Sequence, residues 1–413
     1  MPSPAPLTST RPAPQKNAQE KILVRGVNWL GDAIMATPAL QRLRDAKPNA
    51  RIILLTHQKL ADLWTGHPAL DAVITFSREE SVFQIARRLR AERFDTALVL
   101  PNSPRSALEV FLARIPQRIG ASGPWRKFLL THRVPPRPAF VAMHKRSLSE
   151  IKRLTSVGDG AVVSGQDVRG PGRRAGVPRA LNVRTEAEAA IPPKAHHLWH
   201  YLHLVEALGA TPEPLPPSIP VSEAEVAAIL QKAKYIPPAT GRPLFGLNPG
   251  AEYGPAKRWP RESFISAAKA LQAQTKCHWW IFGGRAYQER AAEIASQIYS
   301  PGLGPFGGVQ SLAGQTSLRE LCAGLKACDL LLTNDTGPMH LAAAVGTPVV
   351  ALFGSTSPEL TGPGLPGDPR NILLNSSVPC APCFLRECPI DFRCMRGLAV
   401  DSVVAAVLKS WQR

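Results

Sequence analysis

The sequence predicts an α/β protein of two domains, each containing a parallel sheet covered by helices. Short apolar runs alternate with segments of helical periodicity up to residue 113, and the alternation resumes after residue 220. Repeated strand–helix units are typical of doubly wound parallel sheets. Between the two series, residues 209–220 contain five prolines, which is typical of an inter-domain linker. We therefore predict two Rossmann-like domains whose parallel sheets face a central cleft.

The N-terminal domain is predicted to span residues 21–215, after a tail of residues 1–20. Its strands are expected at the apolar runs 21–25, 51–56, 72–76 and 96–100. Its helices are expected at 33–46, 60–65, 82–92, 106–113 and 197–208. The alternation is interrupted at about residues 142–194, which we interpret as a basic insertion.

The C-terminal domain is predicted to span residues 216–413. Its strands are expected at 244–247, 279–282, 330–333 and 349–353, and its helices at 221–233, 263–272, 288–298, 318–327, 339–345 and 400–411. A chain of this length is sufficient for two domains with complete cores.

The N-terminal tail is rich in Pro, Ser, Thr and Ala and has no apolar run of the kind found in signal peptides. We interpret it as disordered. No stretch of about 18 apolar residues occurs, so no transmembrane helix is expected. These features predict a cytoplasmic protein.

Positive charge is concentrated in one segment. Residues 114–184 contain twelve arginines and three lysines against three carboxylates, which is +12 of the formal net charge of +18. Such a segment favours a polyanionic partner: nucleic acid, anionic lipid or a phosphorylated glycolipid. The alternative is a solvated and partly disordered loop, which we favour for residues 157–184 because large apolar residues are nearly absent there.

Four of the seven cysteines form a cluster, Cys380-x2-Cys383-x4-Cys388-x5-Cys394. In a cytosolic chain such spacing suggests a metal before it suggests disulfides. The first pair suits zinc, whereas the second pair is more widely spaced than in the usual zinc knuckle. A structural metal and free or redox-active thiols therefore remain alternatives.

The loop at residues 248–260 follows a predicted strand and precedes a predicted helix. Gly250 and Gly254 are expected to permit backbone torsions that other residues disfavour. Lys257 and Arg258 supply two cations beside the helix start, where backbone N–H groups also attract anions. The alternative is an ordinary exposed loop. Considered together with the other loops of the chain, the pattern favours a phosphate site.

The first strand ends in a loop that carries Gly31 and Asp32. Its glycine spacing matches neither a dinucleotide-binding fingerprint nor a P-loop, so NAD binding and P-loop phosphoryl transfer are disfavoured. Asp32 lies at a predicted helix start, where it can act as an N-cap. Its functional alternative is a general base that accepts a proton from a hydroxyl group.

A third loop, residues 333–340, follows an apolar strand and opens a helix. Asp335 or Thr336 can cap this helix, and Gly337 allows close approach to a ligand. The helix N-terminus favours a phosphate, which His340 can also contact. The small polar loop at 353–358 is expected on the same edge and can line the nucleotide pocket.

Together these loops resemble those of glycosyltransferase family 9, and most closely the branch that adds the second heptose. The resemblance covers about residues 21–410 without the insertion. Four motifs carry it: Asn28-Trp29-Leu30-Gly31-Asp32; Leu100-Pro101-Asn102-Ser103 with Ser106-Ala107; Pro249-Gly250-Ala251-Glu252-Tyr253-Gly254-Pro255-Ala256-Lys257-Arg258-Trp259-Pro260; and Thr333-Asn334-Asp335-Thr336-Gly337 with His340.

The resemblance implies a GT-B fold and an inverting transfer of L-glycero-D-manno-heptose from ADP-heptose to the first heptose of the lipopolysaccharide inner core. It implies that catalysis needs no cofactor or metal. The N-terminal domain is then expected to bind the acceptor, and the C-terminal domain the donor. The enzyme is expected at the cytoplasmic face of the inner membrane, on an anionic surface, where the basic segment around Trp125 and Phe128 can hold it.

The site residues follow from the same resemblance. Asp32 is implied to be the catalytic base, and Lys257 to neutralise the leaving diphosphate. Donor binding is assigned to Gly31, Gly250, Glu252, Lys257, Asp335, Thr336, Gly337 and His340, and acceptor binding to Asn102, Ser103 and Ser106. Phe392 departs from the family pattern, because a histidine is often found at this place in the cysteine-rich segment.

Two alternatives are kept. One is another GT-B transferase, such as one that adds a first or third heptose. The other is a basic nucleic-acid-binding protein, which the charge alone suggests. Nucleic-acid binding is disfavoured, because residues 157–184 contain no aromatic side chain on which bases could stack.

Overall fold

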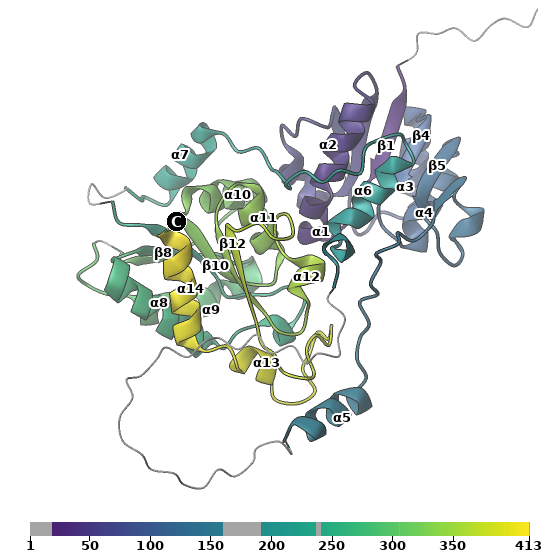
Figure 1. Ribbon diagram of the computed structural model, residues 1–413. Coiled ribbons are helices and arrows are strands. Elements are labelled where there is room, and N and C mark those ends of the chain that lie inside the picture. Colours follow the sequence, from purple (N-terminus) through teal and green to yellow (C-terminus); the bar gives the residue numbers. More distant parts are fainter. Residues whose placement is uncertain (1–18, 160–190, 237–240, 305, 413) are drawn as a thin grey trace, which may run out of the picture.

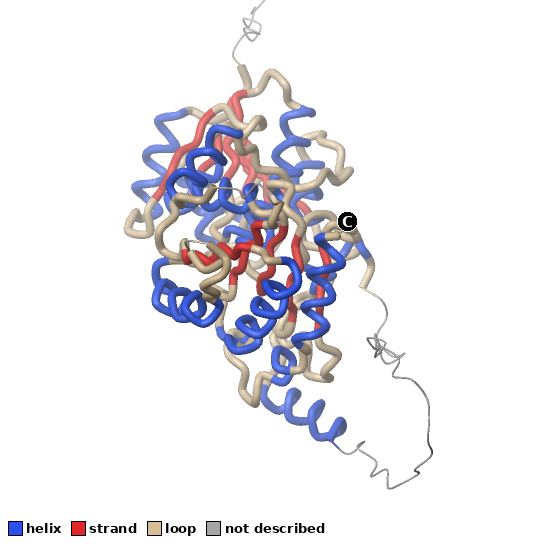
Figure 2. The backbone as a smooth tube through the Cα atoms, turned by 90° about the vertical axis from the view of Figure 1, so that its left-hand side faces the viewer, coloured by secondary structure: helices blue, strands red, loops and turns tan. Residues whose placement is uncertain are grey.

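The computed structural model describes residues 19–159, 191–236, 241–304 and 306–412. It shows two lobes, each with a sheet and flanking helices (Figure 1). Figure 2, turned by 90°, shows the strands of both sheets running between layers of helices. The predicted α/β fold with two domains is confirmed. The predicted disorder of residues 1–20 and the loop at 157–184 fall almost entirely outside the described residues.

The N-terminal sheet has the order β3-β2-β1-β4-β5-β6, and all its neighbouring strands are parallel. Its strands are β1 (Lys21–Arg25), β2 (Arg51–His57), β3 (Ala72–Phe76), β4 (Thr96–Val99), β5 (Gln117–Ala121) and β6 (His132–Val134). Its helices are α1 (Leu30–Met35), α2 (Thr37–Ala46), η1 (Gln58–Trp64), α3 (Val82–Glu92), α4 (Pro104–Leu112), η2 (Arg126–Phe128), η3 (Pro193–Ala195) and α6 (Leu198–Glu206).

The C-terminal sheet has the order β12-β11-β10-β7-β8-β9, and it is also parallel throughout. Its strands are β7 (Leu244–Asn248), β8 (His278–Ile281), β9 (Val309–Ser311), β10 (Leu330–Asn334), β11 (Val349–Phe353) and β12 (Asn371–Asn375). Its helices are α7 (Glu223–Lys232), η4 (Pro255–Lys257), α8 (Arg261–Thr275), η5 (Arg285–Tyr287), α9 (Gln288–Ile298), α10 (Leu318–Ala327), α11 (Gly337–Ala344), α12 (Pro358–Thr361), α13 (Arg393–Arg396) and α14 (Val400–Trp411).

Both sheets therefore have the same Rossmann strand order, because each starts in the middle, winds to one edge and then returns to wind to the other. The central strands β1, β4, β7, β10 and β11 are almost fully buried, as expected for strands covered on both faces. In each domain the order reverses beside the first strand. Ligands of doubly wound sheets bind at this reversal, outside the carboxyl ends of the strands.

Most predicted elements agree with the structure, but the helix expected at 33–46 is divided. It consists of α1 and α2, which meet at Ala36. Pro38 lies in the first turn of α2, where its missing N–H group leaves no helical hydrogen bond unmade. Strands β5, β6, β9 and β12 were not predicted, because each is only three to five residues long and polar residues interrupt its apolar pattern.

The described part of the insertion connects the two domains. After β6 the chain reaches α5 (Leu148–Asp159), which lies against the C-terminal domain. There Arg146 donates its backbone N–H to Cys383 O (3.1 Å) and a guanidinium N–H to Pro379 O (2.7 Å). Ile151 is buried against Cys380 and Cys383. The beginning of the insertion is thus an ordered contact with the cysteine-rich segment.

Candidate active site

The four motif loops lie at the two places where the strand order reverses. The loop with Asp32 follows β1, and the loop with Asn102 follows the adjacent β4. The loop with Lys257 follows β7, and the loop with Asp335 follows the adjacent β10. This placement brings motifs that are about 70 residues or more apart in the sequence to the ligand-binding edges of both sheets.

The two edges meet through α1 and α11, which are in direct contact. A Cβ atom on Gly31 would lie 2.8 Å from the His340 ring, and one on Gly337 would lie 2.9 Å from Leu30 side-chain atoms. Both distances are shorter than real contacts allow, so both glycines are needed for the close approach of the helices. Gly31 and Gly337, predicted to touch the donor, pack the domains together.

Asp32 lies in the first turn of α1 but does not cap it. The N-cap position belongs to Trp29, and no side chain caps this helix. The N-cap alternative for Asp32 is therefore wrong. Instead, the carboxylate faces Tyr201 and His197 of the N-terminal domain and Lys257 of the C-terminal domain. Desolvation by burial raises the pKa of Asp32 to about 6, although the Tyr201 hydrogen bond and the charge of Lys257 act to lower it.

Lys257 is held by a buried carboxylate. Its Nζ lies 2.5 Å from Asp335 Oδ2, and the two side chains are 13% and 4% exposed. Thr356 donates its hydroxyl to the same oxygen at 2.5 Å. Asp335, predicted to bind the donor or to cap α11, therefore fixes Lys257. The Thr336 side chain does not cap α11 either.

Asn334 fixes the rest of the Lys257 loop. It accepts the Trp259 N–H (3.0 Å) and donates to Pro249 O (2.8 Å). Gly250 and Gly254 do not adopt left-handed torsions, so that expectation is wrong. A Cβ atom on Gly254 would instead lie 2.3 Å from Arg386 O, so the chain needs glycine here for packing.

His340 and Glu252 lie in contrasting surroundings. His340 is 5% exposed, and desolvation, partly offset by Asp335, lowers its pKa to about 4, so its ring is neutral at pH 7. Its Nδ1 is buried without a hydrogen-bond partner among the described residues. Glu252 is exposed, and its carboxylate lies 3.7 Å from Lys59 Nζ across the domain boundary. Gly250 packs beside the Tyr287 ring.

The three residues predicted to bind the acceptor lie around the start of α4. Asn102 is exposed, whereas Ser103 is the N-cap and accepts the Ser106 N–H (3.3 Å). Ser106 is 1% exposed, and its hydroxyl donates to Ser103 O (2.8 Å). The geometry thus gives both serines a role in capping α4 and leaves Asn102 accessible.

Neither His197 nor Tyr201 was predicted from the sequence to lie in the site. Both belong to the segment of α6, which was identified only as an amphipathic helix. His197 Nε2 lies 3.8 Å from Asp32 Oδ1 and 3.2 Å from the Tyr201 hydroxyl. The unusual run of histidines at 196, 197 and 200 was the available signal.

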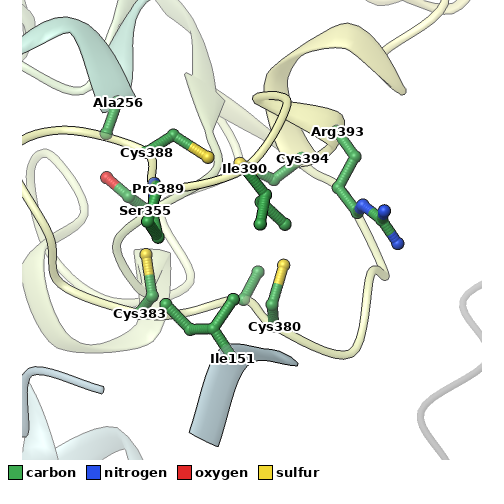
Figure 3. Close-up of a pocket in the computed structure, with 11 residues that line it drawn as sticks. Ile151, Ala256, Ser355, Cys380, Cys383, Cys388, Pro389, Ile390, Arg393 and Cys394 are labelled. Atoms are coloured by element: carbon green, nitrogen blue, oxygen red, sulfur yellow. The ribbon is translucent and has the colours of Figure 1, made fainter. Parts of the chain in front are cut away.

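The four clustered cysteines surround a small cavity together with Ile151, Ser355 and Arg393 (Figure 3). Burial raises the pKa of the Cys380 and Cys383 thiols, and that of Cys394 to about 12, so these thiols are protonated at pH 7. Within the described ranges no group of three or more His, Cys, Asp or Glu side chains is arranged to hold a metal ion. The structural metal suggested by the spacing is therefore not supported.

The cysteine-rich segment instead supports the Lys257 loop. Arg386 O accepts the Ala256 N–H (3.0 Å), and Phe384 O accepts the Tyr253 hydroxyl (2.9 Å). The Tyr253 ring in turn lies 4.9 Å from Lys257 Nζ. This chain of contacts joins α5, the cysteines and the site.

Two Rossmann-like domains that meet through the carboxyl edges of their sheets, with a carboxylate on one and a buried lysine on the other, form the architecture of the GT-B class of glycosyltransferases. The model of glycosyltransferase family 9 (heptosyltransferase) matches residues 173–392. The chain belongs to this family.

Individual relatives agree with the family model. The chain is 30% identical over 350 residues to lipopolysaccharide heptosyltransferase 2 of Salmonella typhimurium, covering 83% of this chain and 85% of that protein. It is 36% identical over 166 residues to lipooligosaccharide heptosyltransferase 2 of Campylobacter jejuni, covering 40% of this chain and 50% of the other. The structure of Escherichia coli ADP-heptose lipopolysaccharide heptosyltransferase II is similar over 95% of this chain and 98% of that one, with a TM-score of 0.68 and 25% identity.

Proposed function

We propose that this enzyme transfers a heptose from ADP-heptose to the first heptose of the lipopolysaccharide inner core. Relatives named heptosyltransferase 2 support this substrate pair, because their similarity extends over both domains. The observation that carries the chemistry is the approach of Asp32 and Lys257 from opposite domains. One of these groups can accept a proton, and the other can stabilise a diphosphate.

Asp32 is the general base of this proposal. A carboxylate of raised pKa is a better proton acceptor than an exposed one, yet it remains largely ionised at pH 7. It takes the proton of an acceptor hydroxyl while that oxygen attacks the anomeric carbon. The bond between this carbon and the diphosphate breaks on the opposite face, so the product has inverted configuration.

Lys257 stabilises the leaving ADP. Asp335, which also accepts the Thr356 hydroxyl, holds its ammonium group at the edge of the C-terminal sheet, next to the N-terminus of α11. A fixed cation and a helix N-terminus both favour the growing charge on the diphosphate. These groups supply the charge that a metal supplies in other transferases, so we infer that transfer needs no metal or other cofactor.

Product analysis tests this function. The full-length protein is incubated with ADP-heptose and a lipid acceptor that carries one heptose, and the product is examined by mass spectrometry. We expect one added heptose. Acceptors without heptose and with two heptoses are the matched controls, and exclusive use of either would assign the enzyme to another step of heptose addition.

The contact with the membrane is part of the same proposal. In the described part of the basic segment, residues 114–159 contain ten cations against two carboxylates. Trp125 and Phe128 are 77% and 68% exposed, and Lys127 lies beside Phe128. Exposed aromatic rings among cations are suited to an anionic lipid surface. No helix in the described part of the chain is long and apolar enough to cross a membrane.

Vesicle sedimentation tests this contact. We expect binding to vesicles that contain anionic lipid, weaker binding at high salt, and a loss of binding in the double variant Trp125→Ala/Phe128→Ala. The variant Phe83→Ala removes an aromatic side chain that is 73% exposed on α3 and serves as the control. Equal binding of all three proteins would refute the assignment of the surface.

A further inference from the structure

Asp32 is surrounded by groups from three elements. Tyr201 and His197 approach from the α6 segment, Lys257 approaches from η4, and His340 of α11 packs against the adjacent Gly31. Lys257 has a task at the diphosphate, and His340 contacts the backbone beside Asp32. The two residues of the α6 segment have no assigned task, although His197 Nε2 lies 3.8 Å from the carboxylate and 3.2 Å from the Tyr201 hydroxyl.

The direction of these hydrogen bonds follows from the number of available protons. A phenol has one proton, and an ionised carboxylate can only accept. Toward Asp32 the Tyr201 hydroxyl can therefore only act as a donor, and its oxygen then accepts from His197 across the distance of 3.2 Å. This requires the proton of the neutral imidazole to reside on Nε2. Desolvation lowers the pKa of His197 to about 4, which is consistent with a neutral ring at pH 7.

Both residues are held firmly. Tyr201 is 2% exposed and belongs to the core of the N-terminal domain. The backbone N–H of His197 donates to Leu360 O of α12 (2.8 Å), and the adjacent His196 ring lies 2.9 Å from Gly362 O. The start of α6 is thus attached to the C-terminal domain at the point where it supports the carboxylate of the N-terminal domain.

We propose that Tyr201 and His197 are positioning residues, which orient the Asp32 carboxylate and stabilise its ionised form through the hydrogen-bond chain His197–Tyr201–Asp32. A carboxylate on a short side chain can rotate, and only one orientation directs a lone pair at the acceptor hydroxyl. Tyr201 fixes this orientation, and His197 fixes Tyr201. Neither residue exchanges a proton with the substrate. This inference rests on the proposed function of Asp32.

The variant Tyr201→Phe removes the hydroxyl and keeps the ring. Because hydrogen bonds to charged groups are strong, we expect kcat to fall roughly 10- to 100-fold with little change in KM for ADP-heptose. The acid limb of the pH profile of kcat moves to higher pH, since the ionised form of Asp32 loses a donor. The variant Tyr299→Phe, at a half-exposed tyrosine of the C-terminal domain, is the control and keeps both values.

The histidine is tested with two variants. His197→Gln retains an N–H donor, whereas His197→Ala does not, so the glutamine variant is expected to recover most of the kcat that the alanine variant loses. A loss of kcat without movement of the acid limb in Tyr201→Phe would mean a merely structural role and overturn the proposal. Unchanged kcat and pH profile in Tyr201→Phe would overturn it as well.

A measurement independent of turnover separates this inference from the proposed function. In protein with 13C-labelled aspartate carboxyls, the signal that disappears in Asp32→Asn reports the titration of Asp32. We expect this titration to move to higher pH in Tyr201→Phe and to stay unchanged in Tyr299→Phe. If the unmodified enzyme transfers no heptose but the titration moves, the proposed function fails and the hydrogen-bond chain is correct. An unmoved titration refutes the chain itself.

Discussion

Replacing Asp32 with asparagine is expected to abolish transfer and, at the same time, to stabilise the protein. Burial raises the pKa of Asp32 from 3.8 to about 6. The folded protein therefore binds a proton more tightly than the unfolded chain does. At pH 7.5 the group is ionised in both states, and folding then places a charge in an environment that disfavours it. Asparagine has nearly the same shape and no charge, so it removes this cost.

The magnitude follows from the pKa. A shift of about 2 units at 1.36 kcal/mol each corresponds to about 3 kcal/mol. This is an upper limit, because 31% of the side chain is accessible to solvent, which screens part of the effect. We expect Asp32→Asn to gain about 1–3 kcal/mol at pH 7.5. A group whose pKa is raised on folding contributes its full stabilisation at pH values below its pKa in the unfolded chain, and this stabilisation is lost as pH rises through its pKa in the folded protein. The stability advantage of Asp32→Asn should therefore disappear as pH falls from 6 towards 4.

Thermal unfolding at a series of pH values measures the difference. At pH 7.5 the midpoint of the N-terminal domain should rise by several degrees, since 1 kcal/mol corresponds to roughly 2–4 °C for a domain of this size. Asp62→Asn, at an exposed carboxylate, is the matched control and should change stability by less than about 0.5 kcal/mol. A variant that is no more stable than the unmodified protein at pH 7.5, or equally stabilised at pH 4, would refute the desolvation of Asp32.

The other predictions concern the lysine, the domain contact and metals. Lys257→Ala should reduce kcat roughly 10²–10³-fold and also destabilise the protein, because it leaves the buried Asp335 carboxylate unpaired. The double variant with Asp335→Asn should recover stability but not transfer, and recovery of both would contradict the role of Lys257. Gly31→Ala should lower kcat, because the added Cβ forces α1 and α11 apart. Gly302→Ala is the control, since a Cβ there meets no atom within 4 Å. Equal kcat values of the two variants would contradict the requirement of transfer for close contact between α1 and α11. Treatment with a strong chelator followed by gel filtration should leave turnover unchanged, and a loss restored by one added metal would disprove metal-independent transfer.

The order of helices and strands could be predicted well because it depends on local pattern. Strand 21–25 and helix 82–92 were placed at their observed bounds, since short apolar runs and one-sided periodicity survive in any environment. Strands β5, β6, β9 and β12 were missed, because their pattern is short and their pairing is set by neighbours distant in the sequence. The motif loops were placed correctly at strand ends and helix starts, but the contacts of their side chains were not predicted.

The sequence by itself determined the two α/β domains, the four motif loops and the family to which they belong, since these depend on residue types and their spacing along the chain. Only the tertiary structure decided what each side chain contacts. In the structure Asp32 and Asp335 do not cap helices, and Asp335 is paired with Lys257. Tyr201 and His197 lie beside Asp32, although they are about 170 residues away in the sequence. The physical reason is that burial, charge and hydrogen bonding at this site join residues far apart in the sequence, within each domain and across the two, and no local segment contains both partners.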